Sequence, residues 1–228
     1  MPRFFVPSTG FDGDIVRITG DDARHIARAL RMATGETVTV CDMHGTTHTC
    51  VLERITDAAS VARIVASTPS DTEPPYPVTL YQAFPKGDKM DAVVQKAVES
   101  GACAVVPFLS ERCVSRPDDK SVEKKIARWQ RIALEAAKQC GRGIIPEVRR
   151  PLSYAQMLEE AASASLPLFC YEGDGTASLR TVLSAADKAG AAAAVAADLN
   201  DDWSAVSDEL YPFTVPLENN SLWQNVAD

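Results

Sequence analysis

The sequence predicts two parts: a small β-barrel or sandwich, followed by an α/β domain with a mostly parallel sheet. Two observations support this prediction. Short strand-like runs follow one another closely in the first 66 residues, and strand-like and helix-like segments alternate from residue 78 onward. Between the two parts, residues 67–77 carry four prolines and no apolar periodicity, which is typical of a linker.

The first part is expected to hold one helix among its strands. Asp21 is a candidate N-cap for a helix over residues 23–32, because a carboxylate accepts hydrogen bonds from the free N–H groups of a first turn. Gly35 follows as a stop signal. Strands are expected at residues 4–6, 15–18, 37–41, 47–55 and 60–66.

The second part repeats a strand-then-helix pattern. Asp88 is a candidate cap for a helix that stops before Gly101, and a long helix is expected from Ser121 to the residue before Gly141. Strands are expected at residues 78–84, 103–109, 166–171, 191–197 and 213–217, and further helices at 153–163, 177–189 and 203–210. Such alternation predicts a mostly parallel sheet whose ligands sit at the carboxyl ends of the strands.

Composition excludes several protein classes. Apolar residues make up 46% of the 228 residues and charged residues 24%, which is globular usage and excludes a disordered chain. The longest apolar runs, such as residues 191–197, are too short to span a bilayer, and the N-terminus has no apolar signal region. We therefore expect a cytoplasmic protein with no membrane segment.

Charge is distributed unevenly along the chain. The net charge of −8 divides into −3 over residues 1–85, +5 over residues 86–150 and −10 over residues 151–228. A polyanion is repelled by the whole chain at long range, but a focused basic middle can still hold one.

Neither cysteines nor histidines predict a metal site. The six cysteines have no CxxC spacing and no secretory context, so we expect reduced thiols. His44 and His48 flank Gly45, which favours a turn over the helical spacing of a metal-binding pair, and no Cys, Asp or Glu ligand set accompanies them.

Three basic clusters are candidates for phosphate contact. Lys86 and Lys89 lie where a strand leads into a helix N-terminus, Arg112 follows the next strand, and the long helix carries polar residues at a spacing of three or four. The alternatives are a solvated turn and an ordinary solvated helix face. Fourteen cations within residues 86–150 favour phosphate contacts.

These motifs, taken together, carry a family resemblance. The sequence reads Pro-Lys-Gly-Asp-Lys-Met-Asp at 85–91, Gln-Lys-Ala at 95–97, Glu-Ser-Gly at 99–101 and Ser-Glu-Arg at 110–112, with Pro107 between the last two and a further match over residues 128–142. In the first part, residues 3–6, 25–26, 30–32 and 35 match in order and spacing. The set resembles the RsmE family, bacterial 16S ribosomal RNA uridine-N3 methyltransferases.

The resemblance implies a fold and a function. A PUA-like RNA-binding β-barrel is expected over residues 1–68, a proline-rich linker over 69–77 and a SPOUT-type methyltransferase domain with a trefoil knot over 78–228. The family methylates N3 of a uridine in 16S rRNA of the small ribosomal subunit, uses S-adenosylmethionine and forms a homodimer. No metal and no membrane are implied.

The resemblance also assigns roles to residues of this chain. Cations near the reacting base stabilise the developing N3 anion, and carboxylates orient groups or accept a proton. The catalytic candidates are Arg112, Arg131, Glu135 and Glu172, with Lys86 and Arg142 as further cations. The RNA-binding candidates are Arg3, His25, Arg31, Lys86, Lys89, Lys96, Arg128 and Arg142. The cofactor-binding candidates are Trp203, Leu217, Leu222 and Ala227.

The last fifth of the chain departs from the family pattern. Asp-Leu-Asn-Asp-Asp-Trp-Ser at 198–204 replaces a loop with three glycines, and residues 217–227 lack the family's arginines. Three interpretations stay open: an enzyme that holds its cofactor mostly through backbone groups, a fold-preserving RNA-binding protein (a pseudoenzyme) without cofactor, and a chain altered at its end. A generic metabolic enzyme is a weaker alternative, because neither a GxGxxG nor a P-loop signature is present.

Overall fold

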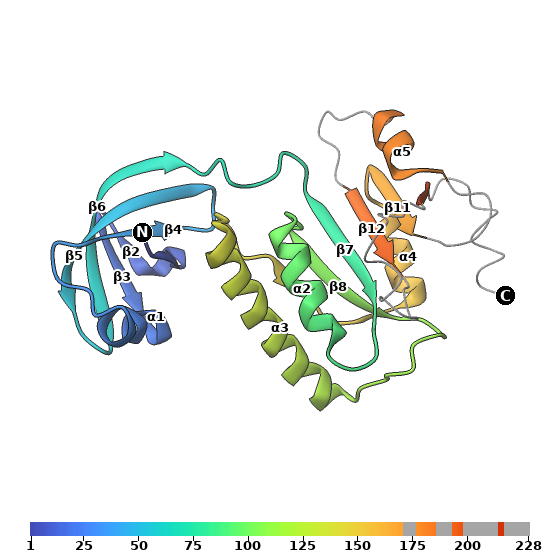
Figure 1. The fold of residues 1–228 in the computed structure, drawn as a ribbon, viewed down its shortest axis with the longest axis horizontal. Coiled ribbons are helices and arrows are strands. Elements are labelled where there is room, and N and C mark those ends of the chain that lie inside the picture. Colours follow the sequence, from blue (N-terminus) through green and yellow to red (C-terminus); the bar gives the residue numbers. More distant parts are fainter. Residues whose placement is uncertain (171–176, 186–192, 198–213, 217–228) are drawn as a thin grey trace. The chain divides into compact units, whose positions relative to one another are not determined.

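The computed structural model describes residues 1–170, 177–185, 193–197 and 214–216 (Figure 1). The chain forms two compact units. Unit 1 comprises Met1–Glu73 and Leu134–Ile145, and unit 2 comprises Pro74–Ala133 and Pro146–Asp228. Each unit is described below by itself.

Unit 1 is built on a curled six-stranded sheet with strand order β1-β4-β5-β6-β3-β2. β1 pairs with β4 in parallel, and all other neighbours are antiparallel. Apolar residues at alternate positions point inward, so that Phe4, Ile18 and Leu52 lie in a buried core beside Ile26. The strands are β1 (Arg3–Phe5), β2 (Phe11–Asp12), β3 (Ile15–Thr19), β4 (Thr37–Cys41), β5 (Thr46–Ile55) and β6 (Ala59–Pro69).

The helix of unit 1 differs from the prediction at both ends. A short 3₁₀ turn, η1 (Ser8–Gly10), comes first; α1 (Gly20–Arg24) then runs directly into the π-helical η2 (His25–Ala29). Thr19 occupies the N-cap position, so the prediction of Asp21 as the cap was wrong; its carboxylate instead accepts a hydrogen bond from Arg24. The helix ends six residues before Gly35, because Arg31 already turns the chain with a φ of 51°.

Unit 2 contains the predicted α/β sheet, with strand order β10-β8-β7-β12-β11-β13 and β9 beside β8. The strands pair in parallel, except that β13 lies antiparallel to β11. The predicted mostly parallel sheet is therefore confirmed, although β9 and β10 were not predicted. The predicted helix over residues 203–210 lies outside the described residues. The strands are β7 (Val78–Ala83), β8 (Ala104–Leu109), β9 (Glu147–Val148), β10 (Leu152–Ser153), β11 (Leu166–Cys170), β12 (Ala193–Ala197) and β13 (Thr214–Pro216).

Within the described residues, four helices accompany this sheet: α2 (Lys89–Glu99), α3 (Asp119–Cys140), α4 (Tyr154–Ala162) and α5 (Leu179–Ala185). The Phe84 ring at the end of β7 packs on Trp129 of α3, with ring centroids 5.5 Å apart. Tyr81 of β7 instead contacts α4. Because side chains alternate along a strand, these two contacts place α3 and α4 on opposite faces of the sheet. Among the helices described, none is long and apolar enough to cross a membrane.

The long helix α3 is capped at both ends, which explains its bounds. Asp118 accepts a hydrogen bond from the Ser121 amide at 2.8 Å, so the helix begins slightly earlier than predicted. Gly141, with a φ of 79°, ends it as the sequence predicted, since the left-handed conformation is favourable for glycine. Residues up to Ala133 belong to unit 2, and residues from Leu134 belong to unit 1.

Helix α4 is anchored to the sheet by a buried polar cluster. The Tyr81 hydroxyl donates to Glu160 Oε1 at 2.8 Å, and the Arg149 guanidinium donates to both Glu160 oxygens. Burial, together with the hydrogen bond to the neighbouring Glu160 carboxylate, raises the pKa of Tyr81 to about 12. The phenol therefore keeps its proton and serves as a donor to Glu160.

This cluster predicts a difference in alkaline stability between wild type and Tyr81→Phe. The folded chain holds the Tyr81 proton at pH values where the unfolded chain has lost it. The contribution of this protonated phenol to the stability of the folded state is complete below about pH 10, the ordinary pKa of tyrosine. It is lost as the pH rises through about 12, the pKa of Tyr81 in the folded chain. The urea midpoint of wild type should therefore fall more steeply from about pH 9 to about pH 11 than that of Tyr81→Phe.

Tyr76→Phe is the matched control, because the Tyr76 hydroxyl makes no hydrogen bond to any described residue. It should retain the wild-type slope. Equal slopes in all three proteins would contradict the assignment.

Candidate active site

The carboxyl ends of four parallel strands meet at one edge of the sheet in unit 2. In the strand register, Ala83 lies beside Phe108, Gln82 beside Ala197, and Ala197 beside Cys170. β7, β8, β11 and β12 therefore end level with one another. We call this edge the carboxyl edge. Ligands of open α/β sheets bind at such an edge, so it is the candidate active site.

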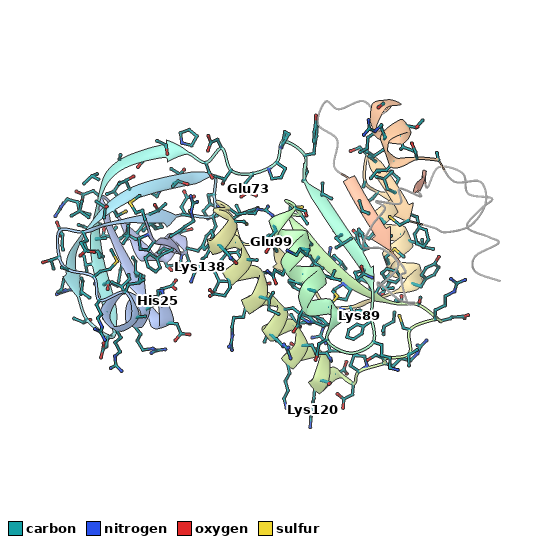
Figure 2. All side chains as sticks on the ribbon, viewed as in Figure 1. His25, Glu73, Lys89, Glu99, Lys120 and Lys138 are labelled. Carbon is teal, nitrogen blue, oxygen red and sulfur yellow. The ribbon has the colours of Figure 1, made fainter. Side chains whose placement is uncertain are left out.

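Two loops with basic side chains leave the carboxyl edge. Lys86 and Lys89 follow β7, where Gly87 turns the chain with a φ of 71°. Arg112 follows β8. These three side chains are exposed, and none makes an ion pair with another described residue. Figure 2 shows Lys89 at the start of α2 and Glu99 at its other end.

The loop after β8 is tied back to its own strand end. The buried Ser110 donates its backbone N–H to Cys113 Sγ at 3.3 Å. Arg116 donates to the Ser110 carbonyl at 3.0 Å. Arg112 lies in the sequence between the residues that make these two contacts. The contacts therefore fix the backbone of the loop that carries Arg112 at the carboxyl edge.

A further cation at this edge was not among the predicted site residues. The Lys125 ammonium lies 5.7 Å from the Phe84 ring centroid and 6.0 Å from the Trp129 ring centroid, within cation–π range of both. Asp91 fixes Trp129 in place by accepting from its indole nitrogen at 3.1 Å. The i, i+4 spacing of Lys125 and Trp129 could have indicated their contact from the sequence. The contact between Lys125 and Phe84 could not be predicted, because it depends on the tertiary structure.

Several predicted cations have acidic partners in the structure. Arg128 pairs with Asp91, and Lys96 pairs with Glu99 at 2.8 Å. Lys138, which lies on α3 as Arg128 does, pairs with Asp22 at 2.8 Å. Arg131 is exposed and makes no ion pair with a described residue. Glu135 is exposed and lies 3.8 Å from Lys138.

Position along α3 separates these residues from one another. Helical rise is about 1.5 Å per residue, so Glu135 lies about 15 Å along the axis from Lys125, and the end of α3 about 22 Å from it. The structure thus places Lys86, Lys89, Arg112 and Lys125 around the carboxyl edge. Glu135 and Arg142 belong to unit 1, whereas the carboxyl edge belongs to unit 2.

The remaining predicted residues lie in unit 1 or outside the described residues. His25 and Arg31 are exposed and make no hydrogen bond with described residues, whereas Arg3 donates to the Arg142 carbonyl at 3.1 Å. Glu172, Trp203, Leu217, Leu222 and Ala227 fall outside the described residues. Within the described ranges, no group of three or more His, Cys, Asp or Glu side chains could hold a metal.

Comparison with known proteins identifies the family. An RNA methyltransferase domain matches residues 72–196, and an RNA methyltransferase PUA domain matches residues 18–65. The chain belongs to the RNA methyltransferase family. It combines the PUA-like first part and the SPOUT-type α/β sheet that the sequence predicted.

Relatives of this RNA methyltransferase agree in sequence and in fold. Ribosomal RNA small subunit methyltransferase E of Bacillus subtilis is 32% identical over 175 residues, which cover 75% of this chain and 68% of that protein. The crystal structure of the enzyme of the same name from Neisseria gonorrhoeae, bound to S-adenosylmethionine, is 30% identical. It has a TM-score of 0.74 and matches over 86% of this chain and 79% of its own. Lpg2936 from Legionella pneumophila, in complex with the same cofactor, is 26% identical with a TM-score of 0.73, over 90% and 83% of the two chains.

In this RNA methyltransferase, Arg142 forms a clamp in unit 1 with Glu73, which Figure 2 labels. Its side chain is 4% exposed, and its Nε donates to Glu73 Oε2 at 3.0 Å, with Nη2 donating to the same oxygen. Glu73 Oε1 accepts from the Gly143 amide at 2.8 Å and from the Ile144 amide at 3.3 Å. Burial alone would raise the pKa of Glu73, but these hydrogen bonds and the Arg142 charge hold it below its ordinary value. The clamp fastens the segment after β6 to the residues that follow α3.

Arg142→Ala should therefore destabilise the protein strongly. It leaves a half-buried carboxylate without its ionic partner, and breaking a buried pair costs about 3 kcal/mol. The urea midpoint should drop well below that of wild type at neutral pH. Because the folded-state pKa of Glu73 is depressed, the stabilisation is present above the ordinary value of 4.5 and is lost as the pH falls through the lower folded value. The difference between the two proteins should shrink in that acidic range.

Arg128→Ala is the control, because its exposed pair with Asp91 contributes about 1 kcal/mol at most. Equal losses in the two variants at neutral pH would show that the clamp does not stabilise unit 1.

Proposed function

We propose that this chain transfers a methyl group from S-adenosylmethionine to N3 of a uridine in 16S ribosomal RNA. Membership of the RNA methyltransferase family supports the reaction class, and the relatives named above support the RNA and the cofactor. The observation that carries the proposal is the cluster of cations that have no acidic partner among the described residues, at the place where the parallel strands end. Lys86 and Arg112 leave adjacent strands there, at the edge where β11 and β12 also end.

The chemistry requires alignment and charge stabilisation. The sulfonium of S-adenosylmethionine is an activated methyl donor, so the protein has to orient uridine N3 toward it and to favour loss of the N3 proton. Positioning two reactants contributes up to about 7–11 kcal/mol. Arg112 and Lys86 would stabilise the negative charge that forms on the uracil ring, since fixed cations act strongly in a site that excludes water. Arg131 is a further candidate cation, and Glu135 or Glu172 would accept the proton.

The described strand ends are compatible with the cofactor. β11 and β12 lie side by side and end together at the carboxyl edge, which is where ligands of open α/β sheets bind. Trp203, Leu217, Leu222 and Ala227 would line the cofactor site. The trefoil knot, the SPOUT domain over residues 78–228 and the barrel over residues 1–68 belong to the same proposal.

The RNA would be held by cations that are free to bind phosphate. Lys86, Lys89 and Arg31 make no ion pair with a described residue, and Arg3 and the His25 ring would contribute from the barrel. Lys96 and Arg128 would each leave the ion pair with a carboxylate and bind a phosphate of the RNA instead. We leave Arg142 out of the proposed RNA contacts, because its guanidinium is committed to Glu73.

We also propose the cellular compartment and the oligomeric state of the enzyme. A substrate in the small ribosomal subunit implies a cytoplasmic enzyme, and we propose a homodimer as the active form. Sedimentation equilibrium of the purified chain tests the dimer directly.

Two measurements test the function. The chain is incubated with tritiated S-adenosylmethionine and small ribosomal subunits that lack this modification, and the digested RNA is examined for 3-methyluridine. Calorimetric titration with S-adenosylmethionine runs in parallel. Methyl transfer to uridine N3 supports the proposal. RNA binding without cofactor binding or methyl transfer would instead indicate the RNA-binding protein without cofactor.

Arg112→Ala should lower the rate of methyl transfer by about 10²–10³-fold, the loss expected when one fixed group that stabilises transition-state charge is removed. Its fold, followed by circular dichroism, should be unchanged, because the side chain is exposed. Arg150→Ala is the matched control: Arg150 is an exposed arginine of the same unit that is already paired with Glu123. Wild-type turnover in Arg112→Ala would refute the role of this residue.

A further inference from the structure

A pocket of about 190 Å³ lies within unit 1, among β1, η1, β3 and the start of α1. Phe5 and Ile18 supply apolar lining. Thr9, Arg17, Thr19 and Asp22 supply polar lining. None of the residues predicted to bind RNA lines it. The pocket therefore offers apolar surface together with hydrogen-bonding groups at a place to which the sequence assigned no role.

The polar groups of this pocket have unused bonding capacity. The Arg17 guanidinium and the hydroxyls of Thr9 and Thr19 make no hydrogen bond with any described residue. Asp22 Oδ1 accepts from Lys138 at 2.8 Å, and its other oxygen has no partner within the described part of the chain. Three exposed arginines of unit 1 are engaged with carboxylates: Arg24 with Asp21, Arg28 with Asp57, and Arg63 with Asp14 and Glu53. Arg17 makes no ion pair with any described residue, and it is the arginine that lines the pocket.

The pocket walls are held by close backbone packing. A Cβ added at Gly10 would lie 2.4 Å from Val6 Cγ1 and 3.1 Å from the Arg17 carbonyl oxygen. η1 therefore lies directly against β1 and β3, and only glycine fits at that point. The shape of this wall is set by packing within the protein and does not depend on a bound ligand.

We propose that this pocket receives one unstacked base of single-stranded RNA while Arg17 binds an adjacent phosphate. The inference rests on the proposed function, because it takes the substrate to be RNA. Pockets for drug-sized ligands measure about 300–1,000 Å³, so a smaller space suits one base rather than a whole nucleotide. Proteins read single-stranded RNA by holding splayed bases against apolar side chains and bonding to their polar edges. The free Asp22 oxygen would accept an N–H of the base, and the two threonine hydroxyls can donate or accept.

Nucleotide titrations followed by NMR test the pocket without any methyl transfer. The ¹⁵N-labelled full chain is titrated separately with the four ribonucleoside 5′-monophosphates, with ribose 5-phosphate and with inorganic phosphate. We expect saturable amide shifts at Thr9, Gly10 and Thr19 with at least one mononucleotide and not with the other two probes. Identical shifts with inorganic phosphate would reduce the site to an anion contact at Arg17 and overturn the base pocket. Absence of shifts at these amides would overturn it as well.

Variants then connect the pocket to RNA binding. Thr19→Tyr fills the pocket, and Thr19 makes no side-chain capping bond that the change would remove. Arg17→Ala removes the phosphate contact from an exposed position, so the fold should survive. Arg54→Ala removes an exposed arginine on β5 that makes no bond to a described residue and serves as the matched control.

The dissociation constant for a 16S rRNA fragment is measured at several salt concentrations by filter binding. Thr19→Tyr and Arg17→Ala should weaken binding about tenfold, the loss expected for one base or phosphate contact, and Arg54→Ala should not. Arg17→Ala should also reduce the magnitude of the slope of log K against log salt by about 0.7, the value for one phosphate of a single strand. Unchanged affinity in both pocket variants would overturn the inference even if wild type methylates RNA. Base binding in the pocket without methyl transfer would leave the pocket standing and refute the proposed function.

Discussion

The parallel pairing of β7, β8, β11 and β12 is the constraint on which the candidate active site depends. Each strand of a parallel pair begins at the same side of the sheet, so each also ends at the same side. The loop with Lys86 and the loop with Arg112 are therefore neighbours, although 25 residues separate these two side chains in the sequence. α2 between them returns the chain across one face of the sheet. This arrangement lets several cations contact one ligand.

Ion pairing divides the basic residues into two groups with different uses. Arg128, Lys138 and Arg142 have carboxylate partners and hold elements of the fold together. Lys86 and Arg112 have none among the described residues and keep their charge available for a ligand. This division explains how a chain with a net charge of −8 presents locally positive sites. In unit 1, Arg17 likewise makes no ion pair with a described residue.

The clamp between Glu73 and Arg142 shows how a residue that matches a family motif can serve the fold. One carboxylate accepts hydrogen bonds from a guanidinium and from two backbone amides. It thereby fixes the segment after β6 to the turn that ends α3. The helix itself is continuous and contributes residues to both compact units, so its C-terminal turns and its N-terminal turns meet different surroundings.

Most strands and helices, the α/β character of the second part and the loops that follow β7 and β8 could be predicted from the sequence, whereas the short elements η1, β2, β9 and β10 were missed. The prediction was possible because strand and helix periodicity and the stop at Gly141 act over a few residues. The tertiary structure alone decided which cations are free, because Arg142 finds its partner 69 residues away and Arg128 finds Asp91 37 residues away. It also decided that Thr19 rather than Asp21 caps the first helix, and that Phe84 lies beneath Lys125. Those outcomes depend on contacts between distant segments, and no local pattern in the chain records such contacts.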